Sequence, residues 1–482
     1  MDRKLEGVQI NGSKYTNIFF ADDATVTMSG NTIERDFKEL KAILKIYEKE
    51  SGLKINEAKT QVLSSLDVIQ NSFDSSKVVK SATVLGCHIG LDGSRESNIQ
   101  AIDARITRTI NEIHIHKLST LEKIKSWNMV VIGKINHILK CTPVVEKWKR
   151  KWMEEGINLV KVAKTISHSR IYAPKSQGGL GMTDLGQHWD VMALTWMRRA
   201  PFVEFPWTES YNNIKNKKIP LNSPWRDFYP KETVVEAYWT AVGVHGPIEG
   251  NPLVTIHIPK HKREELGLKT INDILTTTNM EYLSVQMLQR SLSARFDPSS
   301  GSETMESAFA VSNKSVKNHL RRQCVDIDFL NKFKSAVEDE NRLEDVMMRI
   351  FDPILTPVQM YLKYRISSAS YYTKRFYGDV RDNCSICGNR NTVAHDFRDC
   401  SILKETISKV KDGISRHIER DPTRHELLYG FTEWDAPHRT SSKVIVKLQS
   451  IIARLRFDGR NITPGIALLA LNEFQTPQLF DS

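Results

Sequence analysis

Apolar residues recur three and four positions apart over much of this chain, a spacing that predicts a largely helical protein. The first such segment stops at Gly52, a residue that favours helix ends, and carries apolar side chains at Ile33, Phe37, Leu40, Leu44 and Tyr47. Asn31 and Glu34 have the spacing of a capping box at its start. A helix is therefore expected over residues 33–51.

The same spacing predicts further helices downstream. One helical region spans residues 97–139, with a break near Ser119 and Thr120, and another helix spans 144–161. Residues 303–377 are also mostly helical in pattern. Residues 201–260 are rich in proline and tryptophan, and their irregular pattern predicts no particular element.

Two short segments near the N-terminus predict a β-hairpin. Residues 15–20 and 24–28 are rich in β-branched and aromatic side chains, and Asp22 and Asp23 lie at the bend between them. A second strand pair is expected around residues 82–89. Strands followed by a long run of helices give an α+β fold class.

The adjacent carboxylates of Asp22 and Asp23 suggest a metal site. Two neighbouring negative charges repel each other unless a cation lies beside them. Mg²⁺ is such a cation, since it binds a few carboxylate oxygens together with substrate phosphates. Aspartate is also a common turn residue, and for an isolated Asp-Asp pair that simpler interpretation is favoured. The motifs further along the chain help to decide between a metal site and an ordinary turn.

Positive charge is concentrated in one stretch of the chain. The 482 residues carry a net charge of +11, and residues 97–165 contribute +7 of it, from 13 Lys or Arg against 6 Asp or Glu. A clustered positive field favours a polyanionic partner, and nucleic acid is the commonest one. On charge alone, a solvated helical surface explains the same pattern equally well.

The most basic run in this stretch also contains two tryptophans. We expect its cations to be able to bind phosphates, and these are Lys147, Lys149, Arg150 and Lys151. Trp148 and Trp152 are four residues apart, a spacing that favours a buried helix face over base stacking.

Four potential metal ligands lie close together near the C-terminus. Cys384, Cys387, His395 and Cys400 have the spacing C-x2-C-x7-H-x4-C. Three thiolates and one imidazole complete a tetrahedral zinc shell with no open position, which is typical of a structural site. A redox Cys-x-x-Cys motif is the competing interpretation, but it leaves His395 and Cys400 unexplained. Gly388 permits the tight turn that a zinc loop needs.

Composition excludes several classes of protein. Six cysteines in 482 residues do not make a disulfide scaffold, and Cys87, Cys141 and Cys324 are expected to be ordinary buried thiols. The first residues have no apolar core of a secretory signal, and no apolar run approaches the ~18 residues of a membrane span. A nuclear or cytoplasmic protein without membrane contact is expected. Residues 178–181, Gly-Gly-Leu-Gly, form a turn that lacks the strand–turn–helix pattern of a nucleotide-binding loop.

Several of these motifs occur in the order found in one family. The Phe-Ala-Asp-Asp hairpin at residues 20–23, Ser-Gly-Leu-Lys-Ile-Asn at 51–56 with Lys-Thr at 59–60, Val-Leu-Gly-Cys at 84–87, the glycine turn and the Cys-Cys-His-Cys module follow one another. Together they resemble a LINE-type (non-LTR) retrotransposon reverse transcriptase. The resemblance is firm at residues 7–95, 170–200 and 360–405.

The resemblance implies a role for each matching residue. Asp22 and Asp23 would be catalytic and would bind Mg²⁺ in a two-metal reaction. Residues near the incoming nucleotide and the primer would be Gly52, Asn56, Lys59 and Gly86, the last on a strand at 84–89 that grips the primer end. The basic helices would be a thumb that holds the RNA and DNA of a template–primer duplex by its backbone. The four zinc ligands would form a knuckle that helps bind nucleic acid.

The implied organisation has five parts. These are a partial polymerase palm (1–95), a basic helical thumb-like region (96–200), a linker with a helical region (201–360), a zinc knuckle (361–405) and a helical tail (406–482). Only 21 residues precede Asp22, whereas a palm needs a third carboxylate from an earlier strand. We therefore expect a truncated reverse transcriptase with little polymerase activity alone. The alternatives are a non-catalytic basic zinc-knuckle protein that binds RNA or DNA, and a full polymerase whose start is misassigned.

Overall fold

The computed structural model describes residues 8–64 with several short gaps, 78–90, 95–199, 260–267 with one gap, 316, 320, 331–336, 343–371, 383–384 and 387–475. The chain divides into two compact units. Unit 1 comprises Met1–Thr107, Lys134–Lys149 and Gly186–Val316, and unit 2 comprises Arg108–Gly133, Arg150–Leu185 and Lys317–Ser482. The predictions for residues 201–259 lie outside the described residues.

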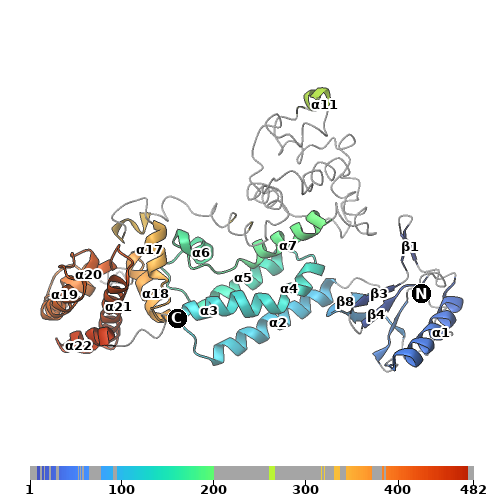
Figure 1. Ribbon diagram of the computed structural model, residues 1–482, viewed down its shortest axis with the longest axis horizontal. Coiled ribbons are helices and arrows are strands. Elements are labelled where there is room, and N and C mark those ends of the chain that lie inside the picture. The colour runs from blue at the N-terminus through green and yellow to red at the C-terminus, as the bar shows by residue number, and fades with distance from the viewer. Residues whose placement is uncertain are drawn as a thin grey trace. The chain divides into compact units, whose positions relative to one another are not determined.

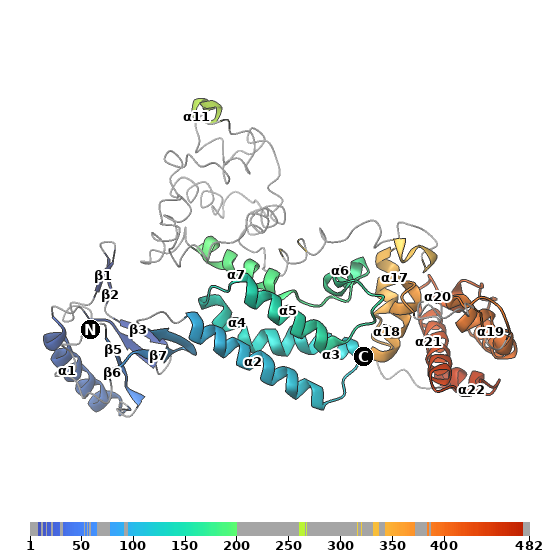
Figure 2. The same cartoon turned by 180° about the vertical axis from the view of Figure 1, so that it is seen from behind.

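The strands described all belong to unit 1 and pair two by two (Figures 1 and 2). Three pairs are antiparallel, namely β1 (Val8–Ile10) with β2 (Ser13–Tyr15), β3 (Asn17–Phe20) with β4 (Asp23–Val26), and β7 (Ser81–Val84) with β8 (Cys87–Gly90). β5 (Val62–Leu63) pairs in parallel with β6 (Val78–Val79). Small sheets beside many helices are compatible with the predicted α+β class.

The predicted N-terminal hairpin is confirmed as the β3–β4 pair. Phe20 pairs with Asp23 at the end of this hairpin, and residues 21–22 lie outside the described residues. The second predicted strand pair is confirmed as β7–β8, but the expectation of one continuous strand over 84–89 is wrong. Leu85 and Gly86 have φ of 49° and 78°, and two consecutive residues with positive φ make a tight hairpin turn there.

The first predicted helix is confirmed as α1 (Ile33–Ser51). It ends at Gly52, whose φ of 73° is left-handed and whose N–H donates to Glu48 O at 3.0 Å. Its N-cap is Thr32 and not Asn31, and no side chain caps the helix. The Thr32 hydroxyl instead bonds Asp36 at 3.0 Å, so the expected capping box is wrong.

The basic helical region is also confirmed, with α2 at Arg95–Ile115 and α5 at Glu146–Val160. The expected break occurs where Ser119 caps α3 (Thr120–Ser126): its Oγ accepts the Glu122 N–H at 3.5 Å, and Glu122 Oε2 accepts the Ser119 N–H at 2.8 Å. The elements between and after these helices are η4 (Trp127–Val131), α4 (Ile132–Cys141), α6 (His168–Tyr172), η5 (Lys175–Gln177) and α7 (Leu185–Arg199).

The glycine turn at residues 178–181 serves close packing in unit 2. A Cβ on Gly179 would lie 2.0 Å from Ala173 O, a separation that no side chain tolerates. The backbone after Gly179 is held by two hydrogen bonds: the Leu180 N–H donates to Arg170 O at 2.8 Å, and the Met182 N–H donates to Ile171 O at 2.9 Å. The turn joins η5 to α7 and not a strand to a helix, which agrees with its exclusion as a nucleotide-binding loop.

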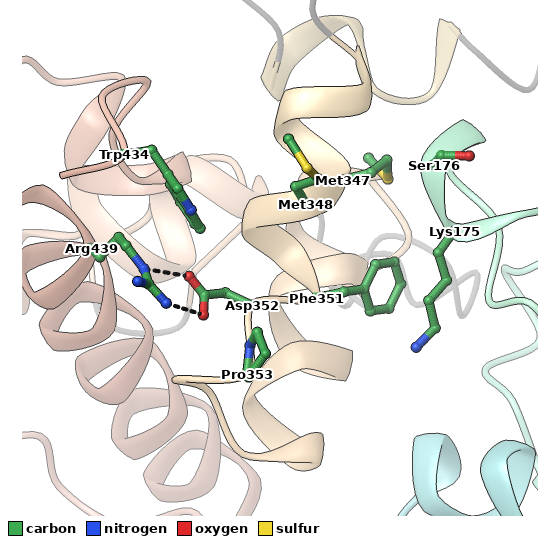
Figure 3. A pocket seen from close by; sticks show the side chains of 9 residues that line it. All are labelled: Lys175, Ser176, Met347, Met348, Phe351, Asp352, Pro353, Trp434 and Arg439. Atoms are coloured by element: carbon green, nitrogen blue, oxygen red, sulfur yellow. Dashed lines mark hydrogen bonds and ion pairs between the residues drawn. The ribbon is translucent and has the colours of Figure 1, made fainter. Parts of the chain in front are cut away.

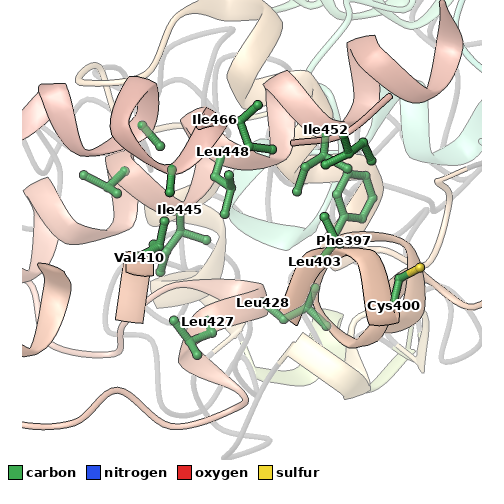
Figure 4. Packing of buried hydrophobic residues seen from close by; sticks show 14 of the residues in the cluster. Phe397, Cys400, Leu403, Val410, Leu427, Leu428, Ile445, Leu448, Ile452 and Ile466 are labelled. Atoms are coloured by element: carbon green, nitrogen blue, oxygen red, sulfur yellow. The ribbon is translucent and has the colours of Figure 1, made fainter. Parts of the chain in front are cut away.

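The later helices form one hydrophobic core in unit 2. Its described elements are α18 (Pro357–Ser367), η14 (His395–Asp399), η15 (Ser401–Leu403), α19 (Lys404–Ile418), α20 (Glu426–Tyr429), α21 (Ala436–Phe457), α22 (Ile466–Leu471) and η16 (Asn472–Gln475). α17 (Leu343–Ile350) precedes them and lies outside this cluster. Figure 4 shows Ile445 and Leu448 of α21 packed in the same cluster as Val410, Phe397 and Cys400. The predicted knuckle and the predicted tail therefore share a core. Shorter elements are α11 (Lys260–Glu265) and η11 (Lys334–Ala336).

Lys363 is a buried cation in this core. Its side chain is 3% exposed, and its Nζ donates to Arg349 O at 3.4 Å. Burial and, to a lesser extent, the Arg349 guanidinium lower the pKa of Lys363 to about 8, although the Asp352 carboxylate opposes both. Because the folded pKa lies below the unfolded value of about 10.4, protonated Lys363 destabilises the fold at every pH below 8.

We expect Lys363→Met to stabilise the protein by roughly 2 kcal/mol at pH 7, after allowing for the lost hydrogen bond. The wild type should gain stability as the pH rises from 8 to about 10.4, and the variant should not gain this increment. Urea unfolding at pH 7 and pH 10, with Lys363→Arg as the variant that keeps the charge, measures both effects. A stability gap between wild type and Lys363→Met that is unchanged by pH would contradict this expectation.

Candidate metal centre and nucleic-acid interface

The structure brings the four predicted metal ligands together. The ligand atoms of Cys384, Cys387, His395 and Cys400 all lie within 4.8 Å of one another. Cys384 Sγ is 3.9 Å from Cys400 Sγ, and Cys387 Sγ is 3.4 Å from His395 Nε2. This cluster could hold one metal ion, and its donors are those of closed zinc sites. Because His395 and Cys400 complete the cluster, the arrangement favours metal binding over a redox Cys-x-x-Cys.

A tight turn presents the first two cysteines. Gly388 follows Cys387 and has a φ of 74°, a left-handed conformation that glycine adopts without strain. The Gly388 N–H donates to Cys384 O at 2.9 Å, and the Cys384 N–H donates to Asn389 O at 2.7 Å. The predicted need for glycine at this position is thereby confirmed.

A single irregular helical turn presents the other two ligands. His395 opens η14, and its N–H donates to Thr392 Oγ1 at 3.0 Å. Cys400 follows η14, and its N–H donates to His395 O at 3.0 Å, which fixes the separation of the two ligands. Cys384, His395 and Cys400 are buried and Cys387 is half-buried, so the cluster is largely closed to water.

The surroundings of Cys400 oppose a free thiolate. Burial raises the pKa of the Cys400 thiol, and the neighbouring Cys384 raises it as well. The Ile402 backbone and the Arg456 guanidinium lower it. Arg456 also lies 3.5 Å from Asp396 Oδ1 through its Nη1. A cation at the centre would reverse the repulsion between thiolates, and Arg456 supplies further positive charge next to it.

The predicted phosphate contacts of the basic run need one correction. Lys149 is 5% exposed, and its Nζ lies 2.8 Å from Asp190 Oδ1 and 4.3 Å from the centre of the Trp189 ring. Lys149 is three residues from Trp152, so the helix turns both side chains to the same buried face. A lysine buried against a carboxylate does not bind a phosphate. The prediction that Lys149 contacts a phosphate is therefore wrong.

The other cations of the run stay on the surface of α5. Lys147 and Arg150 are exposed and form no ion pair with any residue in the described part of the chain. Lys151 pairs with Glu155 at 3.7 Å, one helical turn away. Trp152 is fully buried, as predicted, and Trp148 is half-buried. Lys147 and Arg150 are thus the members of the run that are best placed for phosphates.

The residues implied for the polymerase palm are only partly described. Asp22 lies outside the described residues, and Asp23 begins β4. Asn56 and Lys59 share a local turn, in which the Lys59 N–H donates to Asn56 Oδ1 at 3.2 Å. Gly52 ends α1, as described above. Their roles at a nucleotide or a primer stay predictions.

Gly86 and the three other cysteines complete the predicted set. Gly86 lies in the β7–β8 turn, next to the ring of His137. Cys87 is buried, and burial and the nearby Cys141 raise the pKa of its thiol to about 12. Cys141 is exposed at the end of α4, so the expectation of a buried thiol is wrong there. Cys324 lies outside the described residues.

Asp190 is a structural residue that the sequence analysis missed. It lies in α7 between Trp189 and Val191, which are both buried. A carboxylate inside an apolar helical stretch was the available signal, because such a group is buried only beside a cation or hydrogen-bond donors. This signal would have indicated a buried partner for Asp190 without identifying it as Lys149.

Comparisons with known proteins place this chain in no family. No protein-family model matches the sequence, and no curated protein matches it at a significant level. Within the residues that the structure describes, no helix combines the length and the apolar character needed to cross a bilayer.

Proposed function

We propose that this chain is a nucleic-acid-binding protein of the LINE-type reverse transcriptase lineage. In this proposal a structural zinc ion organises its C-terminal part, and exposed cations on α5 hold an RNA or DNA backbone. The observation that carries the proposal is the convergence of Cys384, Cys387, His395 and Cys400. In the sequence these four ligands belong to one ordered set of motifs, and in the fold they lie close enough together to bind one ion.

Zinc is the metal that best fits this donor set. Three thiolates are soft ligands, and with one imidazole they match the tetrahedral structural sites of zinc. Cys384 and Cys400 belong to the same hydrophobic cluster as α19 and α21. The metal would therefore tie the turn at Cys384 to the C-terminal helices and would perform no chemistry itself.

Binding to a phosphate backbone is supported by the surface cations of α5. Lys147 and Arg150 are exposed, in no ion pair among the described residues, and lie in a stretch that contributes +7 to the net charge of +11. Such cations release counterions when they neutralise phosphates, which gives affinity without sequence readout. The template–primer duplex implied by the resemblance is the proposed ligand.

The proposed lineage also includes a Mg²⁺ site at Asp22 and Asp23. Its support is the β3–β4 hairpin, in which Phe20 pairs with Asp23, the first residue of β4. Carboxylates at such a bend would share Mg²⁺ with the phosphates of a bound nucleotide. We propose no nucleotide transfer by these residues.

The charge reversals Lys147→Glu and Arg150→Glu together should weaken binding of an RNA–DNA hybrid by at least about tenfold at moderate salt. The plot of log affinity against log salt should become shallower by about 2, one for each lost phosphate contact. Fluorescence anisotropy with a labelled hybrid of about 20 base pairs measures both quantities across a salt series.

The matched control reverses two exposed charges on α19, with Lys404→Glu and Lys409→Glu. This variant has the same net charge, so it separates a local contact from the long-range field. Equal losses of affinity in the two variants would remove α5 from the interface. A loss of hybrid affinity of the expected size in the α5 variant, with unchanged affinity in the α19 variant, supports the proposal.

A further inference from the structure

A groove in unit 2 is separate from the metal ligands and from α5. It lies between η5, α17 and the start of α21, and it has a volume of about 430 Å³ (Figure 3). The residues that matter to its chemistry are Lys175, Met348, Phe351, Asp352, Trp434 and Arg439. A volume of this size falls within the range of small-ligand sites.

The walls of the groove are mainly apolar and aromatic. Met348 is 61% exposed and Trp434 is 38% exposed, although both are large apolar side chains. Figure 3 shows the Phe351 ring directed towards Lys175, on the side away from Trp434. Methionine adapts its shape to a ligand, and an indole offers a flat face. A planar group of the ligand would therefore find a hydrophobic surface here.

The charges of the groove leave a net cation. Asp352 is neutralised by Arg439, with Nε to Oδ2 and Nη2 to Oδ1 both at 3.1 Å. Lys175 lies with its Nζ 4.6 Å from the Phe351 ring centre and forms no ion pair among the described residues. Burial lowers the pKa of Lys175, and the nearby Lys125 ammonium lowers it as well. An anion beside Lys175 would relieve this repulsion.

The Trp434 indole is itself surrounded by cations. The guanidinium of Arg439 lies 5.6 Å from its ring centre, and that of Arg349 lies 5.9 Å from it. Cations near a ring are attracted to its electron-rich face, so they hold the indole in place. The groove therefore has the Trp434 indole, held by two guanidinium groups, in one part of its lining and the Lys175 ammonium beside Phe351 in another.

We propose that this groove binds one unpaired nucleotide of single-stranded RNA or DNA, with the base against Trp434 and Met348 and the phosphate at Lys175. The inference rests on the proposed function, because it adds a single-strand site to a protein proposed to hold a nucleic-acid backbone. A nucleotide pairs a flat base with a phosphate, which matches an exposed indole and a nearby ammonium. The net charge of +11 also attracts a polyanion over long range.

The test uses the full zinc-loaded chain and two probes of the same length. One is a fluorescein-labelled uridine oligoribonucleotide of about 12 nucleotides, and the other is an RNA–DNA hybrid of about 12 base pairs. Trp434→Ala should weaken binding of the single strand about tenfold without changing the salt slope, because stacking is lost and no phosphate contact is. Lys175→Met should weaken it and make the salt slope shallower by about 0.7. Neither variant should change hybrid affinity.

Two controls keep the result specific to the groove. Phe457→Ala removes an aromatic side chain that is 91% exposed at the end of α21 and should leave both affinities unchanged. Trp434→Phe keeps a stacking surface and should retain most of the single-strand affinity. An unchanged single-strand affinity in Trp434→Ala, with normal hybrid binding, would overturn the groove proposal and leave the proposed function standing.

Two further outcomes are decisive. If the wild type binds neither probe in a salt-dependent way, the proposed function fails and this inference fails with it. A labelled peptide rich in glutamate and phenylalanine tests the alternative occupant. If this peptide binds the wild type but not Trp434→Ala, and does not displace the bound oligoribonucleotide, the groove binds an acidic peptide. That result would overturn the nucleotide proposal.

Discussion

Cys400→Ser is expected to release the metal and to unfold the C-terminal core. Cys400 is fully buried and belongs both to the ligand cluster and to the hydrophobic cluster of α19, α21 and α22. Structural zinc contributes on the order of 10 kcal/mol to folding in small domains, because the site does not exist in the unfolded chain. A serine hydroxyl is a poor zinc ligand, so three ligands should not retain the ion.

Two measurements check this expectation. Metal analysis of the purified protein should fall from about one equivalent of zinc to almost none. Hydrogen exchange should show that α19 and α21 lose their protection, since they pack on the same cluster as Cys400. Cys141→Ser is the matched control, because Cys141 is exposed and lies outside the ligand cluster. A Cys400→Ser protein that keeps one equivalent of zinc and a protected core would refute the structural metal site.

Lys149→Met is expected to destabilise the protein by about 3 kcal/mol or more. The substitution removes the ammonium that lies 2.8 Å from Asp190 Oδ1, while that carboxylate stays at 6% exposure. A buried carboxylate that loses the cation beside it either keeps a less well compensated charge or takes up a proton. The cation–π contact of Lys149 with Trp189 is lost as well.

Urea unfolding, followed by the protection of α5 and α7 in hydrogen exchange, measures this effect. Lys147→Met is the matched control on the same helix, because Lys147 is exposed, and it should change the stability by less than about 0.5 kcal/mol. The double variant Lys149→Met with Asp190→Leu should recover much of the loss, since apolar residues replace both charges. A Lys149→Met protein as stable as Lys147→Met would show that the buried pair is unimportant.

Elements with local signals could be predicted from the sequence. The break at Ser119 needs only the reciprocal bonds of Ser119 and Glu122. The end of α1 can be predicted from Gly52 alone. The β3–β4 hairpin can be predicted from two β-rich segments that flank a short turn signal. The metal ligands were also predictable, because Cys384, Cys387, His395 and Cys400 lie within 17 residues and their chemistry is specific.

Features built from distant segments could not be predicted. The environment of Lys149 depends on Asp190, which lies on another helix, so the basic run alone gave the wrong exposure. The turn at Leu85 and Gly86 interrupts a β-rich stretch. The alternation of side chains along a strand, with its period of two residues, does not show where the chain reverses direction. The groove at Trp434 joins three segments, at Lys175, Asp352 and Arg439, and each is more than 80 residues from the next along the chain.

The salt dependence of hybrid binding by the wild-type chain tests the central claim most directly. The claim is that this zinc-containing protein holds a nucleic-acid backbone through exposed cations such as Lys147 and Arg150. We predict a straight line of log affinity against log salt with a slope of about −2 or steeper, since each phosphate contact contributes about −0.9. A slope near zero, or no binding at low salt, would contradict the account.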